Sequence, residues 1–127
     1  MSVLKADTIQ STGGGAATLT KQSAAKMFVN LTGTGTIANN KSLNVSSVTD
    51  NASGDYTFTF TSSFDDGEYA VAGMCRSNAS GEADDDLRVV MAGNSVTGSL
   101  RVGTTYANSA GGYDVPRVHT VIHGDLA

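Results

Sequence analysis

The side chains best suited to chemistry in this chain of 127 residues are its two histidines, its single cysteine and several grouped carboxylates. His119 and His123 are four residues apart in a run that reads as a strand, so both project from one face. Two histidines on one face can bind a metal ion, but Asp125 is the only carboxylate close by in the sequence. Surface or interface histidines are the better interpretation, and we expect no metal site.

The carboxylates gather in two stretches that read as loops. The first stretch contains Glu82, Asp84, Asp85 and Asp86, but it lacks the ligand spacing of an EF-hand. Since calcium takes six to eight oxygen ligands, a solvated and self-repelling loop tip is the simpler interpretation, with calcium binding left open. The second stretch, residues 63–68, is predicted to form a turn.

Three further features are typical of enzymes, but each has a simpler structural explanation here. Cys75 has no histidine nearby in the sequence and is most simply a small core residue. The motifs TGGG and GTGT are not followed by the Lys-Ser/Thr pair of a phosphate-binding loop. Paired carboxylates for glycoside cleavage would lie in Gly- and Ser-rich loops without aromatic sugar platforms. We therefore expect no catalytic residue, no cofactor and no enzyme.

Composition and charge exclude further classes of function. The formal net charge is −4, and the 8 Lys and Arg residues are scattered, so we expect no binding to nucleic acid. There is no apolar run long enough to insert in a membrane. The first residues lack the apolar segment of a signal peptide, which makes synthesis in a cytoplasm the expectation.

Alternation of apolar and polar residues predicts strands throughout the chain. In DYTFTFT, Tyr56, Phe58 and Phe60 point to one face and threonines to the other. Residues 26–64 read as two strand pairs, the second being a hairpin of strands 43–49 and 55–61. The apolar spacing breaks between residues 45 and 48, which predicts a bulge or an early strand end.

Four further strand-like runs follow the predicted hairpin. The first run has one face formed by Tyr69, Val71, Gly73 and Cys75, with Met74 on the opposite face. In the last run, Val118 and Ile122 are expected to point inward. These four strands are predicted at 68–76, 86–92, 95–106 and 115–124. Turn signals are found at 32–35, 63–68, 77–85, 92–94 and 107–114. The pattern predicts an all-β protein, an antiparallel β-sandwich that is jelly-roll-like.

Residues 1–24 differ from the rest because they contain little apolar mass. Ordering a backbone costs about 1–2 kcal/mol per residue, which so few apolar side chains cannot offset alone. We therefore expect an extended N-terminal arm that serves assembly or attachment, ahead of a sandwich domain at 25–127. The arm would dock on neighbouring chains through Val3, Leu4, Ile9 and Leu19. The predicted sandwich core includes Phe28, Tyr56, Phe58 and Phe60.

The stretch 24–73, AAKMFVNLTGTGTIANNKSLNVSSVTDNASGDYTFTFTSSFDDGEYAVAG, resembles a module that recurs in tail fibres and small virion proteins of marine bacteriophages. The opening VLKADTIQSTGGGAATLT and the closing PRVHTVIHGDLA are similar to the start and end of such proteins. The matching positions are Ala25, Lys26, Phe28, Val29, Asn30, Gly33, Thr34, Gly35, Thr36, Asn44, Val45, Ser46, Ser47, Thr49, Asp50, Asn51, Gly54, Asp55, Tyr56 and Thr57.

The resemblance implies a structural protein of the virion, synthesised in the host cytoplasm. It would be a homotrimeric, tail-fibre-like module, attached by its arm to other virion proteins of the capsid or tail and contacting a receptor on the host surface. The alternative is a capsid decoration or head-fibre protein that stabilises the capsid without binding a receptor. The loops at 77–85 and 107–114 are expected to face the host. Their candidate contact residues are Asn78, Asp84, Asp85, Tyr106, Asn108 and Tyr113.

Overall fold

A computed structural model of the protein describes residues 12–13, 24–76, 88–107 and 110–127. The described residues form eight strands and no helix. The strands are β1 (Met27–Thr32), β2 (Ala38–Leu43), β3 (Val45–Ala52), β4 (Asp55–Phe60), β5 (Ala70–Arg76), β6 (Arg88–Val96), β7 (Ser99–Tyr106) and β8 (Arg117–His123). Most of the predicted arm and the predicted loop 77–85 lie outside the described residues.

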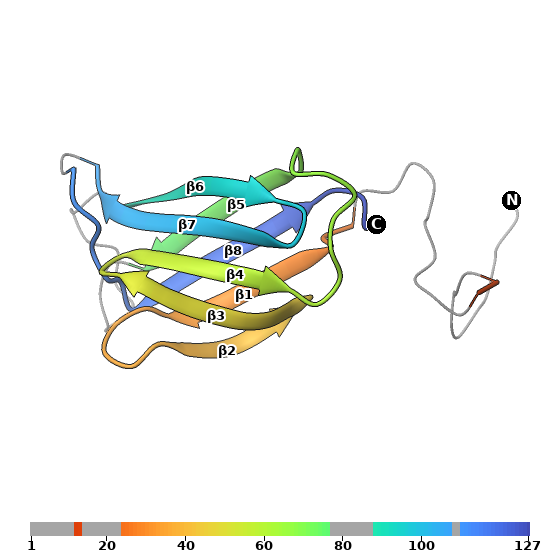
Figure 1. Ribbon diagram of the computed structural model, residues 1–127. Helices are drawn as coiled ribbons and strands as arrows, with labels where there is room; N and C mark the ends of the chain where they lie inside the picture. Colours follow the sequence, from red (N-terminus) through yellow and green to blue (C-terminus); the bar gives the residue numbers. More distant parts are fainter. Residues whose placement is uncertain (1–11, 14–23, 77–87, 108–109) are drawn as a thin grey trace, which may run out of the picture.

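The strands form two antiparallel sheets of four, which pack face to face as a β-sandwich (Figure 1). Sheet 1 has the order β2-β1-β8-β5, and sheet 2 has the order β3-β4-β7-β6. The first and last strands thus lie in one sheet, where β1 and β8 are neighbours. The predicted antiparallel β-sandwich is confirmed.

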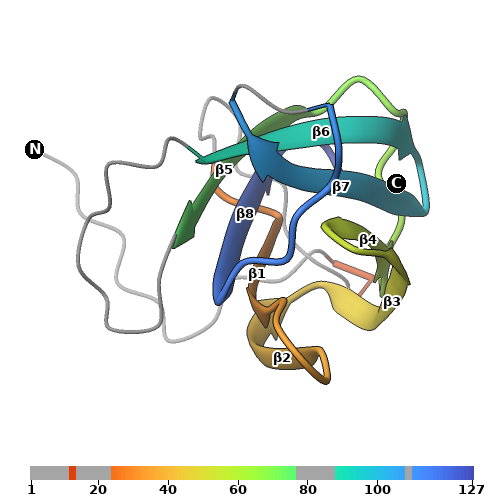
Figure 2. The ribbon, with the colours of Figure 1, turned by 90° about the vertical axis from the view of Figure 1, so that its left-hand side faces the viewer.

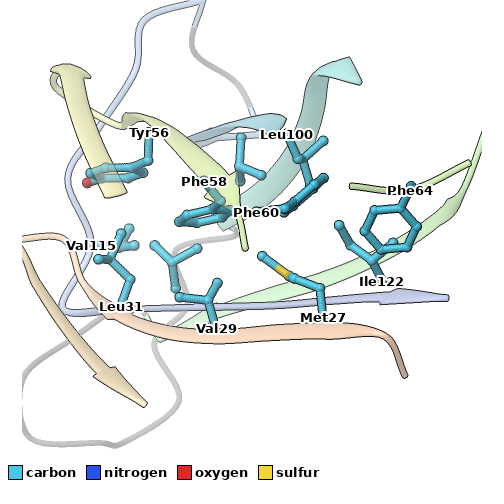
Figure 3. Packing of buried hydrophobic residues seen from close by; sticks show 12 residues of the cluster. Met27, Val29, Leu31, Tyr56, Phe58, Phe60, Phe64, Leu100, Val115 and Ile122 are labelled. Atoms are coloured by element: carbon cyan, nitrogen blue, oxygen red, sulfur yellow. The ribbon is translucent and has the colours of Figure 1, made fainter. Parts of the chain in front are cut away.

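The core lies between the two sheets and follows from the alternation in the sequence. Every second residue of β4 is buried, and the same period appears in β1 and β8. Figure 3 shows side chains from both sheets meeting in one layer. The core consists of Met27, Val29, Leu31, Tyr56, Phe58, Phe60, Phe64, Leu100, Val102, Val115, Val118 and Ile122.

Several predictions about the strands are confirmed. Residues 26–64 do form two strand pairs, β1 with β2 and β3 with β4. The break in apolar spacing is a bulge, since the register of β3 on β4 shifts between Val45 and Ser47. Val118 and Ile122 are fully buried, and Met74 is exposed opposite the core-facing Cys75.

Two predictions about individual residues are wrong. Phe28 is not in the core, because it occupies a half-buried position of β1 between the buried Met27 and Val29. Leu43 does not open the hairpin strand but ends β2, where it is exposed and pairs with Phe28. Asn44, with a φ of 58°, separates β2 from β3. A single polar residue therefore moves the strand boundary by two positions.

The turn predicted at residues 92–94 is also wrong. These residues lie within β6, where the register on β7 shifts between Ala92 and Ser95. The chain reverses later, between Val96 and Ser99, the last and first residues of the two strands. Gly and Asn in this stretch mark a bulge in an edge strand and not a reversal.

The sandwich has two distinct ends, visible at the right and left of Figure 1. We call the first the entry end, because the chain enters β1 there and the Lys26 amide donates to the Ile122 carbonyl over 2.9 Å. We call the second the loop end. It contains the β1–β2 turn, the β3–β4 hairpin turn and the connection from β7 to β8, and β5 ends and β6 begins there. Figure 2 views the molecule from this end.

Candidate functional site

Two tyrosines predicted to face the host lie together at the loop end. The ring centroids of Tyr106 and Tyr113 are 4.6 Å apart, with their planes inclined by 59°. Tyr106 ends β7, and Tyr113 lies in the connection to β8. Tyr113 is 45% exposed, so the pair presents an aromatic surface with a polar group to solvent. The sequence alone did not show that these two rings touch.

Asp114 fixes the connection that carries Tyr113. Its Oδ1 atom accepts a hydrogen bond from the Gly54 amide over 2.6 Å and lies 3.0 Å from the Tyr56 hydroxyl. The same hydroxyl lies 3.0 Å from the Gly33 carbonyl oxygen, so one proton is shared between two acceptors. One carboxylate thus joins the β3–β4 hairpin to the β7–β8 connection.

Burial and the neighbouring Asp114 carboxylate together raise the pKa of Tyr56 far above its ordinary value. Burial is the larger cause, because the phenolate would lose its hydration between the sheets. Tyr56 is fully buried and is therefore held neutral, as a hydrogen-bond donor. Its role is to position the loop end.

Close backbone contacts complete the attachment of this loop. The Thr104 amide donates to the Gly54 carbonyl over 2.8 Å, and the Tyr113 amide donates to the Thr104 carbonyl over 2.8 Å. A Cβ atom on Gly54 would lie 2.3 Å from the Tyr113 nitrogen, and one on Gly112 would lie 2.1 Å from the Ser53 carbonyl oxygen. Glycine at both positions lets the hairpin and the connection touch.

An ion pair lies on the outer face of sheet 2, beside this loop. Arg101 of β7 donates from Nε to Asp55 Oδ1 over 2.8 Å and from Nη2 to Asp55 Oδ2. Asn51 also donates to Asp55 Oδ1, over 3.3 Å. The hydrogen bonds from Arg101 are the main cause that lowers the pKa of Asp55.

A groove of about 740 Å³ runs from this ion pair to the loop. Gly103 lies at its centre, paired with Asp55 on one side and with Met91 on the other. A wall of the groove is formed by residues 110–112 of the connection, and Gly112 bridges to Thr105. The groove therefore opens at the loop end, on the face of sheet 2 that points away from the core.

The other residues considered for chemistry do not form a site in the described part of the chain. His119 and His123 lie on the outer face of sheet 1. His119 pairs with Asn30 of β1 and Met74 of β5, and His123 pairs with Ala70 of β5. No group of three or more His, Cys, Asp or Glu side chains gathers as in a metal site within the described residues. Over the same residues, no helix is long and apolar enough to cross a membrane.

The predicted turn at residues 63–68 is present between β4 and β5, and the Glu68 amide donates to Asp66 Oδ1 over 2.8 Å. Unexpectedly, this turn also contributes Phe64 to the core, where its ring lies 5.0 Å from that of Phe60. The carboxylates of the turn are exposed, while its aromatic side chain anchors it.

Many of the predicted site residues are not described. Among the candidate host-facing residues, Asn78, Asp84, Asp85 and Asn108 lie outside the described residues, as do the assembly residues Val3, Leu4, Ile9 and Leu19. Sequence reasoning did not identify Asp55, Arg101 or Asp114. A signal for Asp55 existed in the strand alternation, which places it on the same outer face as Thr57.

Comparison with known protein families, curated proteins and solved structures gave no match to this chain.

Proposed function

We propose that this chain is a bacteriophage virion structural protein, a trimeric tail-fibre-like module that is attached by its N-terminal arm and contacts the host surface. The observation that carries the proposal is the separation of the two ends of the sandwich. The chain enters β1 at Met27, beside Ile122, whereas Tyr106 and Tyr113 lie at the loop end. An arm bound to the particle would direct the loop end outward.

The build of the loop end suits recognition. Its turns are tied together by Tyr56, Asp114 and Gly54, so the exposed Tyr113 is carried by a rigid base. Loops on a rigid scaffold are common carriers of binding residues, and tyrosine is enriched in binding surfaces. In this role the protein needs neither a catalytic group nor a cofactor.

A second feature favours the alternative of a capsid decoration or head-fibre protein. The registers of sheet 1 align Leu43, Phe28, Val121 and Ala72 in one row across all four strands of its outer face. Leu43 is 48% exposed, and Met74 on the same face is 75% exposed. A row of apolar residues across an outer face, with exposed members at Leu43 and Ala72, suits a permanent contact with another virion subunit.

Particles that carry a Tyr113→Ala variant test the two roles. Host adsorption should fall while particle yield stays normal, because Tyr113 is exposed and its loop is held by backbone contacts. The matched control is Met74→Ala, which truncates an exposed side chain on the outer face of sheet 1. Unchanged adsorption with Tyr113→Ala, combined with lower yield with Met74→Ala, would favour the decoration role.

Deletion of the arm, residues 1–24, tests attachment. The described core begins at Met27, so the shortened chain should fold but should not join the particle.

For the full-length protein, sedimentation equilibrium should give a trimer. A monomer of 13.0 kDa at micromolar concentration would contradict the trimeric assembly.

A further inference from the structure

We propose that the groove over Gly103 binds a neutral saccharide. The inference rests on the proposed host contact and deepens it, because it names the chemical class that the loop end would recognise. The groove has a volume of about 740 Å³, within the range of roughly 300–1,000 Å³ that is usual for ligand sites.

The charges of the described groove lining do not favour an ion as the ligand. Its lining contains two charged side chains among the described residues, Asp55 and Arg101, and they neutralise one another in a two-point ion pair. A ligand with a net charge would therefore meet no excess of opposite charge. A neutral ligand with both hydrogen-bond donors and acceptors fits such a pair better.

The ion pair also offers the hydrogen-bonding groups that adjacent hydroxyls use. Arg101 is 55% exposed and keeps N–H donors beyond the two that face Asp55. Asp55 accepts from Arg101 and Asn51, and its two carboxylate oxygens have further lone pairs. Two neighbouring hydroxyls of a sugar can donate to the carboxylate and accept from the guanidinium.

The floor of the groove suits the flat C–H face of a sugar ring. Gly103 has no side chain, and a Cβ atom built on it would lie 3.8 Å from the Met91 Cε atom. Met91 is 52% exposed, so its methyl group is available beside the glycine. The lining residues Ala52, Ala92, Ala107 and Ala110 are also small, so a ring can lie close to the backbone.

Gly103 also gives a way to block the groove without disturbing the fold. Its φ is outside the left-handed region, and the nearest atoms to a Cβ, Gly54 O and Met91 Cε, are both at 3.8 Å. Valine is favoured in strands, so Gly103→Val should fold normally while its side chain fills the floor. The matched control is Thr59→Val, on the outer face of the same sheet but outside the groove lining.

The test is binding of the full-length protein to a panel of neutral di- to tetrasaccharides of glucose, galactose, mannose and N-acetylglucosamine, measured by NMR. We expect at least one member to bind and to shift the amide signal of Gly103 and the methyl signal of Met91. Gly103→Val should abolish binding. Asp55→Asn should weaken binding on the order of tenfold or more, the usual effect of losing a charged hydrogen-bond partner. Thr59→Val should bind like the wild type.

A second matched pair separates the groove from the rest of the surface. Met91→Ala should weaken binding, and Met74→Ala, an exposed methionine in sheet 1, should leave it unchanged. Binding of no panel member, or binding that survives Gly103→Val in a folded protein, would overturn the saccharide site.

Host adsorption by particles with Gly103→Val distinguishes this inference from the proposed function. Lower adsorption without saccharide binding would contradict the saccharide site but keep the host contact. Saccharide binding that Gly103→Val abolishes, together with unchanged adsorption, would support the site and contradict its role in host contact.

Discussion

The Tyr56 hydroxyl lies 3.0 Å from the Asp114 carboxylate Oδ1, and this contact joins residues that are 58 positions apart in the chain. Tyr56 belongs to β4, and Asp114 belongs to the connection between β7 and β8. The contact links the hydrophobic core to the exposed loop end, because the ring of Tyr56 is fully buried. It is the reason that the position of Tyr113 depends on core packing.

Tyr56→Phe should destabilise the protein by about 1–3 kcal/mol, because Asp114 and the Gly33 carbonyl lose a donor. The variant should also change the pH dependence of stability. The folded pKa of Tyr56 is raised above the ordinary value of 10.0, so the folded state holds its proton longer than the unfolded state. Its contribution is complete below pH 10.0 and is lost as the pH rises further.

Urea unfolding from neutral to alkaline pH measures both effects for Tyr56→Phe. The wild type should lose more stability above pH 10.0 than the variant does. The variant keeps a smaller decline, because burial also raises the pKa of Tyr69. Equal alkaline declines in the two proteins would show that Tyr56 is not held neutral by its surroundings.

Gly54→Ala should cost clearly more stability than Gly35→Ala. Both glycines have a left-handed φ, +65° and +67°, so each alanine pays the same conformational cost of roughly 1–2 kcal/mol. The Cβ at residue 35 meets nothing within 4 Å, whereas the Cβ at residue 54 would overlap with Tyr113 and Thr104. Thermal unfolding of the two variants isolates this overlap, and equal losses would show that the loop yields freely.

Gly54→Ala should also displace the loop at Tyr113. The fluorescence or NMR signals of Tyr106 and Tyr113 should change in this variant and should stay unchanged in Gly35→Ala, since the rings contact one another.

Phe58→Ala should destabilise the protein by about 3–5 kcal/mol, because the ring is fully buried between the sheets. Thr57→Ala should cost about 1 kcal/mol or less, since it removes one exposed hydrogen bond from Asn51. Urea titration of both variants compares the two faces of β4. Similar losses would mean that the outer face is buried in solution, as in an assembly that covers sheet 2.

Asp55→Asn should lower stability at neutral pH but not in strong acid. The pKa of Asp55 is lowered mainly by its hydrogen bonds with Arg101, so this stabilisation is present above the ordinary value of 3.8 and is lost as the pH falls through the folded pKa. High salt should also reduce the difference between wild type and variant, because Arg101 is exposed. A difference that does not change with pH or salt would exclude the ion pair as its cause.

The alternation of apolar residues determined the strands and their inward faces. Phe58, Val118 and Cys75 face inward as predicted, because the side-chain period of a strand is a property of the chain itself. Phe28 was misplaced because its aromatic side chain reads like a core residue, although the alternation with Met27 and Val29 assigns it to the outer face. The stretch 92–94 was misplaced because glycine and asparagine occur in bulges as well as in turns.

Only the tertiary structure decided which of these elements meet. Three contacts of the loop end join segments from different strands or loops. They are the ring contact of Tyr106 with Tyr113, the hydrogen bonds of Asp114 with Tyr56 and Gly54, and the ion pair of Asp55 with Arg101. Sequence patterns describe the faces of single strands, whereas these contacts depend on strand order and register in two packed sheets. The fold class could therefore be predicted from local periodicity, while the groove over Gly103 exists only once β4, β7 and β6 lie side by side.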